Sequence, residues 1–121
     1  MKKPKTKFDN LRNKQIDILV AEKIKGWKYC LQAGEDYDTE YYRTQQNIRY
    51  YDWCPTFNFS AAVEASRGHK IRLSSEKDMC GWFASVDGAS AYDATPARAL
   101  CKALLLTLEK KNARSRSAKT H

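Results

Sequence analysis

The amino-acid sequence predicts a small layered α+β domain, in which an antiparallel sheet of two to four strands packs with three helices. The observations that predict it lie in the last third of the chain. Two strand-like segments, residues 69–74 and 80–86, are joined by a polar turn at residues 75–78. A helix then begins at Thr95-Pro96, where threonine caps free backbone amides and proline fits the first helical position.

This last helix is predicted to be amphipathic. Its apolar residues recur three and four positions apart, which places them on one face that can cover a sheet. They are Ala97, Leu100, Cys101, Leu104, Leu105 and Leu108.

An earlier helix is predicted over residues 13–25, with Asn13 as its cap and Gly26 as its stop. A short helix should begin at Asn58 and end at Gly68. The apolar residues of the first helix again recur at helical spacing. They are Ile16, Leu19, Val20 and Ile24.

The middle of the chain predicts one or two more strands. Residues 28–32 and 47–53 have strand character, and an acidic turn at residues 34–38 lies between them. A two-stranded hairpin alone is marginally stable in water. Either segment 47–53 therefore joins the sheet or a second copy pairs with it, which makes a homodimer an expectation.

The net charge of +8 belongs to the two ends of the chain. Residues 1–14 carry +5, residues 15–109 carry −2 and residues 110–121 carry +5. Blocks of like charge are typical of disordered tails. We therefore expect one folded domain over residues 13–110, with disordered basic tails at residues 1–12 and 111–121. Such tails can hold nucleic acid loosely.

Several functional classes lack their signatures. There is no apolar run of about 20 residues and no signal peptide, so we expect a soluble intracellular protein without a membrane partner. The four cysteines stand singly, and His69 is the one histidine inside the expected fold. We therefore expect no metal and no cofactor. With no phosphate loop or nucleophile motif either, the sequence predicts no enzyme.

The order of several elements resembles the small bacteriophage proteins grouped as the phage α–β–α sandwich domain. The resemblance rests on Leu19–Lys23 running into Gly26-Trp27, on Trp53-Cys54-Pro55-Thr56, and on Ala94-Thr95-Pro96-Ala97-Arg98-Ala99. It covers about residues 16–108. It implies a phage accessory protein of a kind generally without an assigned activity, acting in the host cytoplasm on a host protein or protein complex. Inhibition of a bacterial antiviral defence is one such role.

A tyrosine- and arginine-rich stretch is the candidate binding surface, because both residue types are enriched at interface hot spots. Its members are Tyr37, Tyr41, Tyr42, Arg43, Arg49, Tyr50 and Tyr51. Three alternatives stay open at this point. They are packing of some tyrosines on the helices, stacking of the rings on nucleic-acid bases beside the basic tails, and a small-ligand pocket between subunits lined by these groups.

Overall fold

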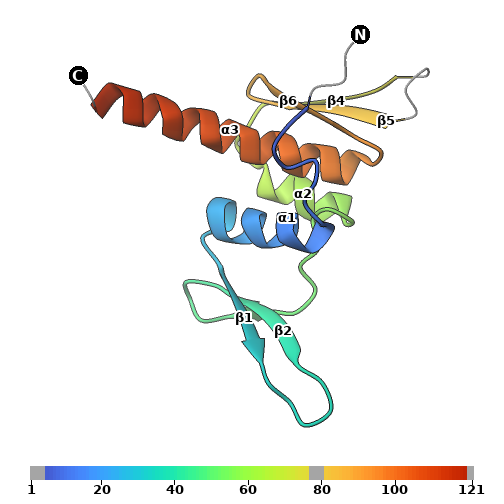
Figure 1. Ribbon diagram of the computed structural model, residues 1–121, viewed down its shortest axis with the longest axis vertical. Helices are drawn as coiled ribbons and strands as arrows, with labels where there is room; N and C mark the ends of the chain where they lie inside the picture. Colours follow the sequence, from blue (N-terminus) through green and yellow to red (C-terminus); the bar gives the residue numbers. More distant parts are fainter. Residues whose placement is uncertain (1–4, 77–80, 120–121) are drawn as a thin grey trace.

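The computed structural model describes residues 5–76 and 81–119 (Figure 1). The ends of both predicted tails, part of the 75–78 turn and Cys80 lie outside these residues. The predicted α+β class is confirmed, with the strands divided between two small sheets rather than joined in one. The elements are α1 (Asn13–Leu19), η1 (Val20–Lys25), β1 (Lys28–Gln32), β2 (Thr39–Arg43), β3 (Arg49–Tyr50), α2 (Phe59–Ala65), β4 (Ile71–Glu76), β5 (Gly81–Val86), β6 (Ala89–Asp93) and α3 (Pro96–Lys119).

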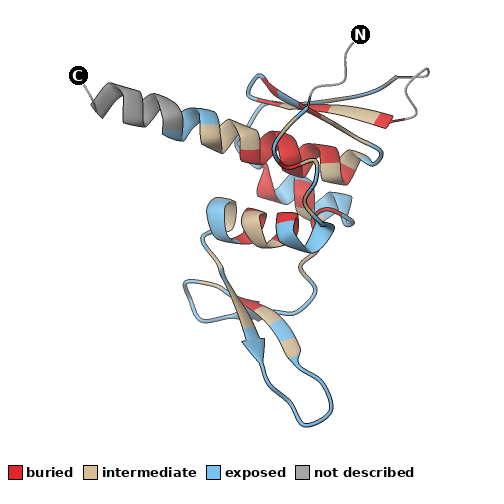
Figure 2. Cartoon of the chain, viewed as in Figure 1, coloured by how far each residue is buried: buried red, intermediate tan, exposed pale blue. Residues whose placement is uncertain are grey.

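The elements form layers around α3. This helix runs between the β4–β5–β6 sheet on one side and helices α1 and α2 on the other (Figure 1). The β1–β2 hairpin projects from the far side of α1, away from the β4–β5–β6 sheet. Buried residues gather on α3 and on the elements beside it, whereas the hairpin is mostly exposed (Figure 2). Among the described residues, no helix is both long and apolar enough to cross a membrane.

Small residues let α3 lie close to its sheet. Leu100 and Leu104 are essentially inaccessible to solvent, and the small strand residues Ala84 and Ala91 belong to the same core cluster. The helix is buried on more than the predicted face, since every residue from 99 to 105 is buried. The core side chains from the other elements include Ile16, Val20, Ala62, Ala65, Ala84, Val86 and Ala91.

Most predicted helix ends are confirmed. The Thr95 hydroxyl accepts a hydrogen bond from the Arg98 amide, and the Asn58 side chain accepts one from the Ala61 amide. Gly26 ends the first helical segment in the left-handed conformation, with a φ of 72°, which glycine adopts without steric cost. The short helix α2 ends at Ala65, before the predicted stop at Gly68, and a turn follows in which Gly68 has a φ of 90°.

The start of the first helix differs in detail from the prediction. Asn13 is the first helical residue and not its cap; the residue before it, Arg12, donates its amide to the Gln15 side chain. The Asn13 side chain instead accepts a hydrogen bond from Arg98 of α3. Asn13 therefore ties α1 to α3.

Two strands were not predicted, β2 and β6. Strand β6 pairs with β5 through a turn in which Asp87 and Gly88 both have positive φ, of 50° and 90°. Asp-Gly is the typical sequence of such a two-residue hairpin turn, so this signal was present in the sequence. Strand β2 pairs with β1 and β3, whereas the expected strand at residues 47–53 is reduced to β3.

Part of the segment predicted as an N-terminal tail packs on the fold. Phe8 is only 5% exposed and joins the core, and Asp9 accepts a bond from Lys102 at 2.8 Å. Buried Lys102 needs a negative partner, and Asp9 supplies one. At the other end, α3 continues as a helix to Lys119 and so passes the predicted boundary at residue 110.

Replacing Leu104 with alanine should lower the free energy of unfolding by about 2–5 kcal/mol, because it opens a cavity between α3 and the sheet. Chemical denaturation measures this loss. Val63→Ala is the matched control, since Val63 is 41% exposed and should change stability little. A Leu104→Ala loss no larger than that of the control would contradict the central position of α3.

Candidate functional site

The β1–β2–β3 sheet has two chemically different faces because side chains alternate along each strand. Tyr29, Tyr42 and Tyr50 occupy one face, and cross-strand pairing places Tyr42 opposite both of the others. Tyr41, Arg43, Arg49 and Tyr51 belong to the other. We call these the inner face and the outer face.

The inner face attaches the sheet to the helices. Trp27, which follows Gly26, stacks on Tyr50 with ring centroids 4.8 Å apart and meets Trp53 edge-on at the same distance. Tyr29 packs beside Tyr42 at 5.5 Å. Aromatic pairs of this geometry contribute about 0.5–1.5 kcal/mol each beyond their buried area. These contacts fix the orientation of the projecting sheet.

Two of the predicted site residues therefore have structural roles. Tyr42 is only 6% exposed, and burial, together with the nearby Asp17 carboxylate, raises the pKa of its hydroxyl well above the ordinary value. Tyr50 is partly exposed, but one side of its ring is covered by Trp27. The alternative that some tyrosines pack on the helices fits Tyr42, whereas Tyr50 is exposed and stacks on Trp27, which lies outside the helices.

The outer face brings together residues that the sequence separates. The Arg49 guanidinium lies 4.6 Å from the centre of the Tyr41 ring, and the Tyr41 and Tyr51 rings lie 5.9 Å apart. Interaction with Tyr51 and then with Tyr41 raises the pKa of Arg49, which stays charged in any case. Tyr51 is 55% exposed, so the cluster is assembled and open to a partner.

Arg43 and Tyr37 lie apart from this cluster in different ways. Arg43 is exposed at the end of β2, and its cross-strand partner is Arg49. Tyr37 is 77% exposed in the loop between β1 and β2, at the tip of the projecting hairpin (Figure 1). Sequence analysis did not single out Lys28, which pairs with Arg43 from β1. Only the register of the missed strand β2 identifies it.

Two of the described cysteines lie in environments that disfavour a reactive thiolate. Burial raises the pKa of the Cys101 thiol, and burial with the nearby Asp17 and Asp52 carboxylates raises that of Cys54. A reactive thiolate needs the opposite shift. His69 lies 2.6 Å from Asp87 beside the β5–β6 turn. The described residues contain no group of three or more metal-ligating side chains placed to share an ion.

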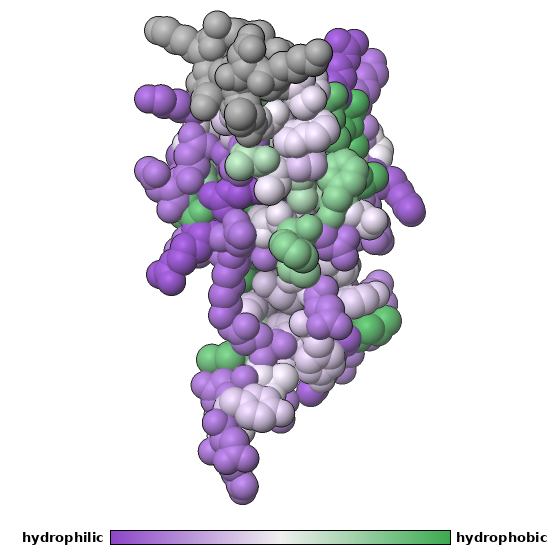
Figure 3. All heavy atoms as spheres, turned by 90° about the vertical axis from the view of Figure 1, so that its right-hand side faces the viewer, coloured by the Kyte–Doolittle hydropathy of each residue, from purple (hydrophilic) through white to green (hydrophobic). Residues whose placement is uncertain are grey.

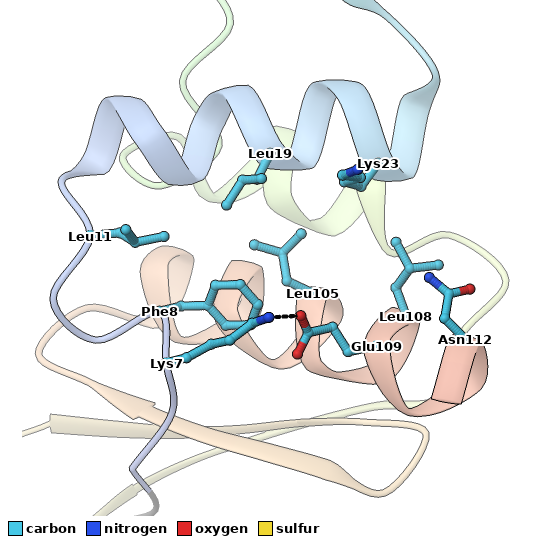
Figure 4. A pocket seen from close by; sticks show the side chains of 9 residues that line it. All are labelled: Lys7, Phe8, Leu11, Leu19, Lys23, Leu105, Leu108, Glu109 and Asn112. Atoms are coloured by element: carbon cyan, nitrogen blue, oxygen red, sulfur yellow. Dashed lines mark ion pairs between the residues drawn. The ribbon is translucent and has the colours of Figure 1, made fainter. Parts of the chain in front are cut away.

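A hollow apart from the outer face lies between the N-terminal segment, α1 and α3 (Figure 4). Its volume is about 500 Å³. Phe8, Leu19 and Leu105 are among its apolar walls, and Lys7 forms an ion pair with Glu109 at its edge. This hollow offers mainly apolar contact. The outer face combines aromatic rings with cations and so has more directed groups for recognition.

No protein-family model, curated protein or solved structure matches this chain. The candidate site therefore rests on its own geometry, and the resemblance to phage proteins stays an expectation from the sequence.

Buried Asp17 supports the segment that follows the outer face. Its carboxylate accepts bonds from the Thr56 amide at 2.9 Å and the Thr56 hydroxyl at 2.8 Å, and its backbone carbonyl accepts one from the Trp53 indole. Burial raises the pKa of Asp17 above 3.8, although the bonds from Thr56 partly offset this shift. Burial thus disfavours the ionised form of Asp17, whereas the Thr56 donors favour it.

Replacing Asp17 with alanine should cost about 1–3 kcal/mol more than replacing it with asparagine, because alanine leaves the Thr56 donors buried and unsatisfied. A raised folded-state pKa stabilises the fold below the unfolded pKa, and this contribution is lost as pH rises through the folded pKa. The stability of Asp17→Asn relative to the natural protein should therefore improve as pH rises from about 4 to 7. Denaturation series over this range check both expectations, and a pH-independent difference would contradict the second.

Proposed function

We propose that this protein is a non-enzymatic accessory protein that binds a host protein or protein complex through the outer face. The arrangement of Tyr41, Arg49 and Tyr51 carries the proposal. Tyrosine and arginine bury large contact areas for a small loss of side-chain freedom, and both are enriched at binding hot spots. Here their mutual contacts hold the rings and the guanidinium together before any partner binds.

The position of the sheet supports the same proposal. The inner face anchors it to the helices, while the hairpin projects beyond them (Figure 1). A partner can therefore approach the outer face without disturbing the core. The phage setting, the host cytoplasm and the inhibition of an antiviral defence come from the sequence resemblance, and they complete the proposal.

A nucleic-acid-binding protein is the second candidate, because cations and exposed rings share the outer face and both chain ends are basic. Single-strand binders combine those two features. Binding to phosphates weakens steeply with salt, whereas a tyrosine-anchored protein contact changes less. The acidic residues at the hairpin tip favour the protein partner.

The double variant Tyr41→Ala/Tyr51→Ala should lose partner binding with little loss of stability. Truncating a hot spot costs about 2 kcal/mol or more, which corresponds to roughly a 30-fold weaker complex. Affinity capture from infected cells, followed by titration of the captured host protein, measures this loss. Phe57→Ala is the matched control, since Phe57 is an exposed aromatic residue outside the outer face. Equal binding by the double variant and the control would count against the outer face.

We further expect a homodimer, because both sheets end in strands with an unpaired edge among the described residues. The edges are β1 and β3 in one sheet and β4 and β6 in the other. Pairing of such edges in a symmetric dimer is a common way to satisfy them. Light scattering at micromolar concentration should give twice the chain mass of 13.9 kDa. A monomer mass at every concentration tested would end this expectation.

A further inference from the structure

Three cations lie side by side across the projecting sheet. Lys28 of β1 pairs in register with Arg43 of β2, and Arg43 pairs with Arg49 of β3. Neighbouring strands lie about 4.8 Å apart, so the three residues form a continuous row. We call them the cationic row.

The cationic row is unfavourable for the isolated fold. Like charges directly opposite each other on neighbouring strands destabilise a sheet. Within the described residues, none of the three takes part in an ion pair, and the Lys28 and Arg43 side chains make no hydrogen bond. Packing does not require these cations either, because all three residues are exposed. Their charges are therefore available to an anionic group outside the chain.

A hollow beside the cationic row gives such a group room to enter. It has a volume of about 410 Å³, and Lys28 and Arg43 both line it. The rest of its lining is glycine and polar residues from the end of the first helical segment and from the β2–β3 turn. These residues are Gly26, Thr44, Gln45 and Asn47.

The opposite end of the hairpin carries the opposite charge. Glu35, Asp36 and Asp38 are exposed at its tip, where hydrophilic side chains gather at the lower end of the molecule (Figure 3). The length of β1 separates the tip from the cationic row by about 13 Å, at about 3.3 Å per residue. This exceeds the Debye length of about 8 Å at physiological salt, so a partner senses each end separately.

This polarity distinguishes between two classes of partner. A nucleic-acid strand laid along the sheet would meet favourable charge at one end and repulsion at the acidic tip. A folded protein can present carboxylates to one end and avoid or complement the other, as interfaces with complementary potentials do. We propose that the outer face recognises an acidic patch on a partner protein, with its carboxylates against the cationic row and its apolar groups against Tyr41 and Tyr51. This inference rests on the proposed function and specifies the chemistry of the partner.

Charge reversal in the full-length protein tests the inference. The variant R43E/R49E is compared with R67E/R72E, which makes the same change in net charge at exposed arginines outside the outer face. The probes are a fluorescent oligoglutamate peptide and a thymidine oligonucleotide of equal charge, followed by anisotropy at two salt concentrations. We expect oligoglutamate to bind at least about tenfold more weakly to R43E/R49E than to the natural protein, and R67E/R72E to keep most of its affinity.

Three results would overturn the inference. Equal losses in both variants would assign the binding to net charge or to the basic chain ends. Tighter binding of the oligonucleotide, lost in R43E/R49E, would assign the outer face to nucleic acid. If the natural protein does not bind oligoglutamate, the inference that the partner presents an acidic patch is wrong. Thermal unfolding checks that each variant folds, and Lys28→Glu on β1 replaces R43E/R49E if that pair does not.

The host protein captured in the tyrosine experiment separates this inference from the proposed function. We expect that neither R43E/R49E nor Tyr41→Ala/Tyr51→Ala captures that host protein. If R43E/R49E still captures the host protein but the tyrosine variant does not, the proposed function holds. The inference that the partner presents an acidic patch is then wrong. Capture that survives in both variants would overturn the proposed function itself.

Discussion

The burial of α3 between two layers is the constraint on which the rest of the structure depends. Because residues 99–105 are all buried, the helix cannot present a polar side to solvent there. Lys102, only 2% exposed, consequently carries its charge into the interior, where Asp9 and Asp93 pair with it and the Tyr92 carbonyl accepts a third bond. An unpaired charge at this depth would be strongly destabilising. The N-terminal segment is held on the fold by this requirement.

The same network extends to α1, the element beside the projecting sheet. Arg98, one turn before Lys102, bonds to Asp93, to the Asn13 side chain and to the Leu11 carbonyl. It thereby connects α3, β6 and the start of α1. Further along α1, Asp17 holds Thr56 and Trp53, and Trp53 meets Trp27 beneath the projecting sheet. The orientation of the outer face thus follows from a chain of contacts that begins at the central helix.

The two faces of the projecting sheet place chemically identical residues in different environments. Tyr42 and Tyr41 are neighbours in the chain and identical in chemistry, yet one is buried against the helices and the other faces solvent beside Arg49. The alternation of side chains along β2 separates them. Alternation also gathers Lys28, Arg43 and Arg49 on one face, so a single strand register creates both the anchor and the charged surface.

Local sequence signals determined the α+β class, the caps at Asn58 and Thr95 and the stop at Gly26, because capping and left-handed backbone depend on a few adjacent residues. The binding composition, rich in tyrosine and arginine, was also evident. Tertiary structure alone decided which tyrosines are free, since that follows from the register of β2. It also decided that Phe8 and Asp9 belong to the core, because the buried ammonium of Lys102, far along the chain, requires a partner there.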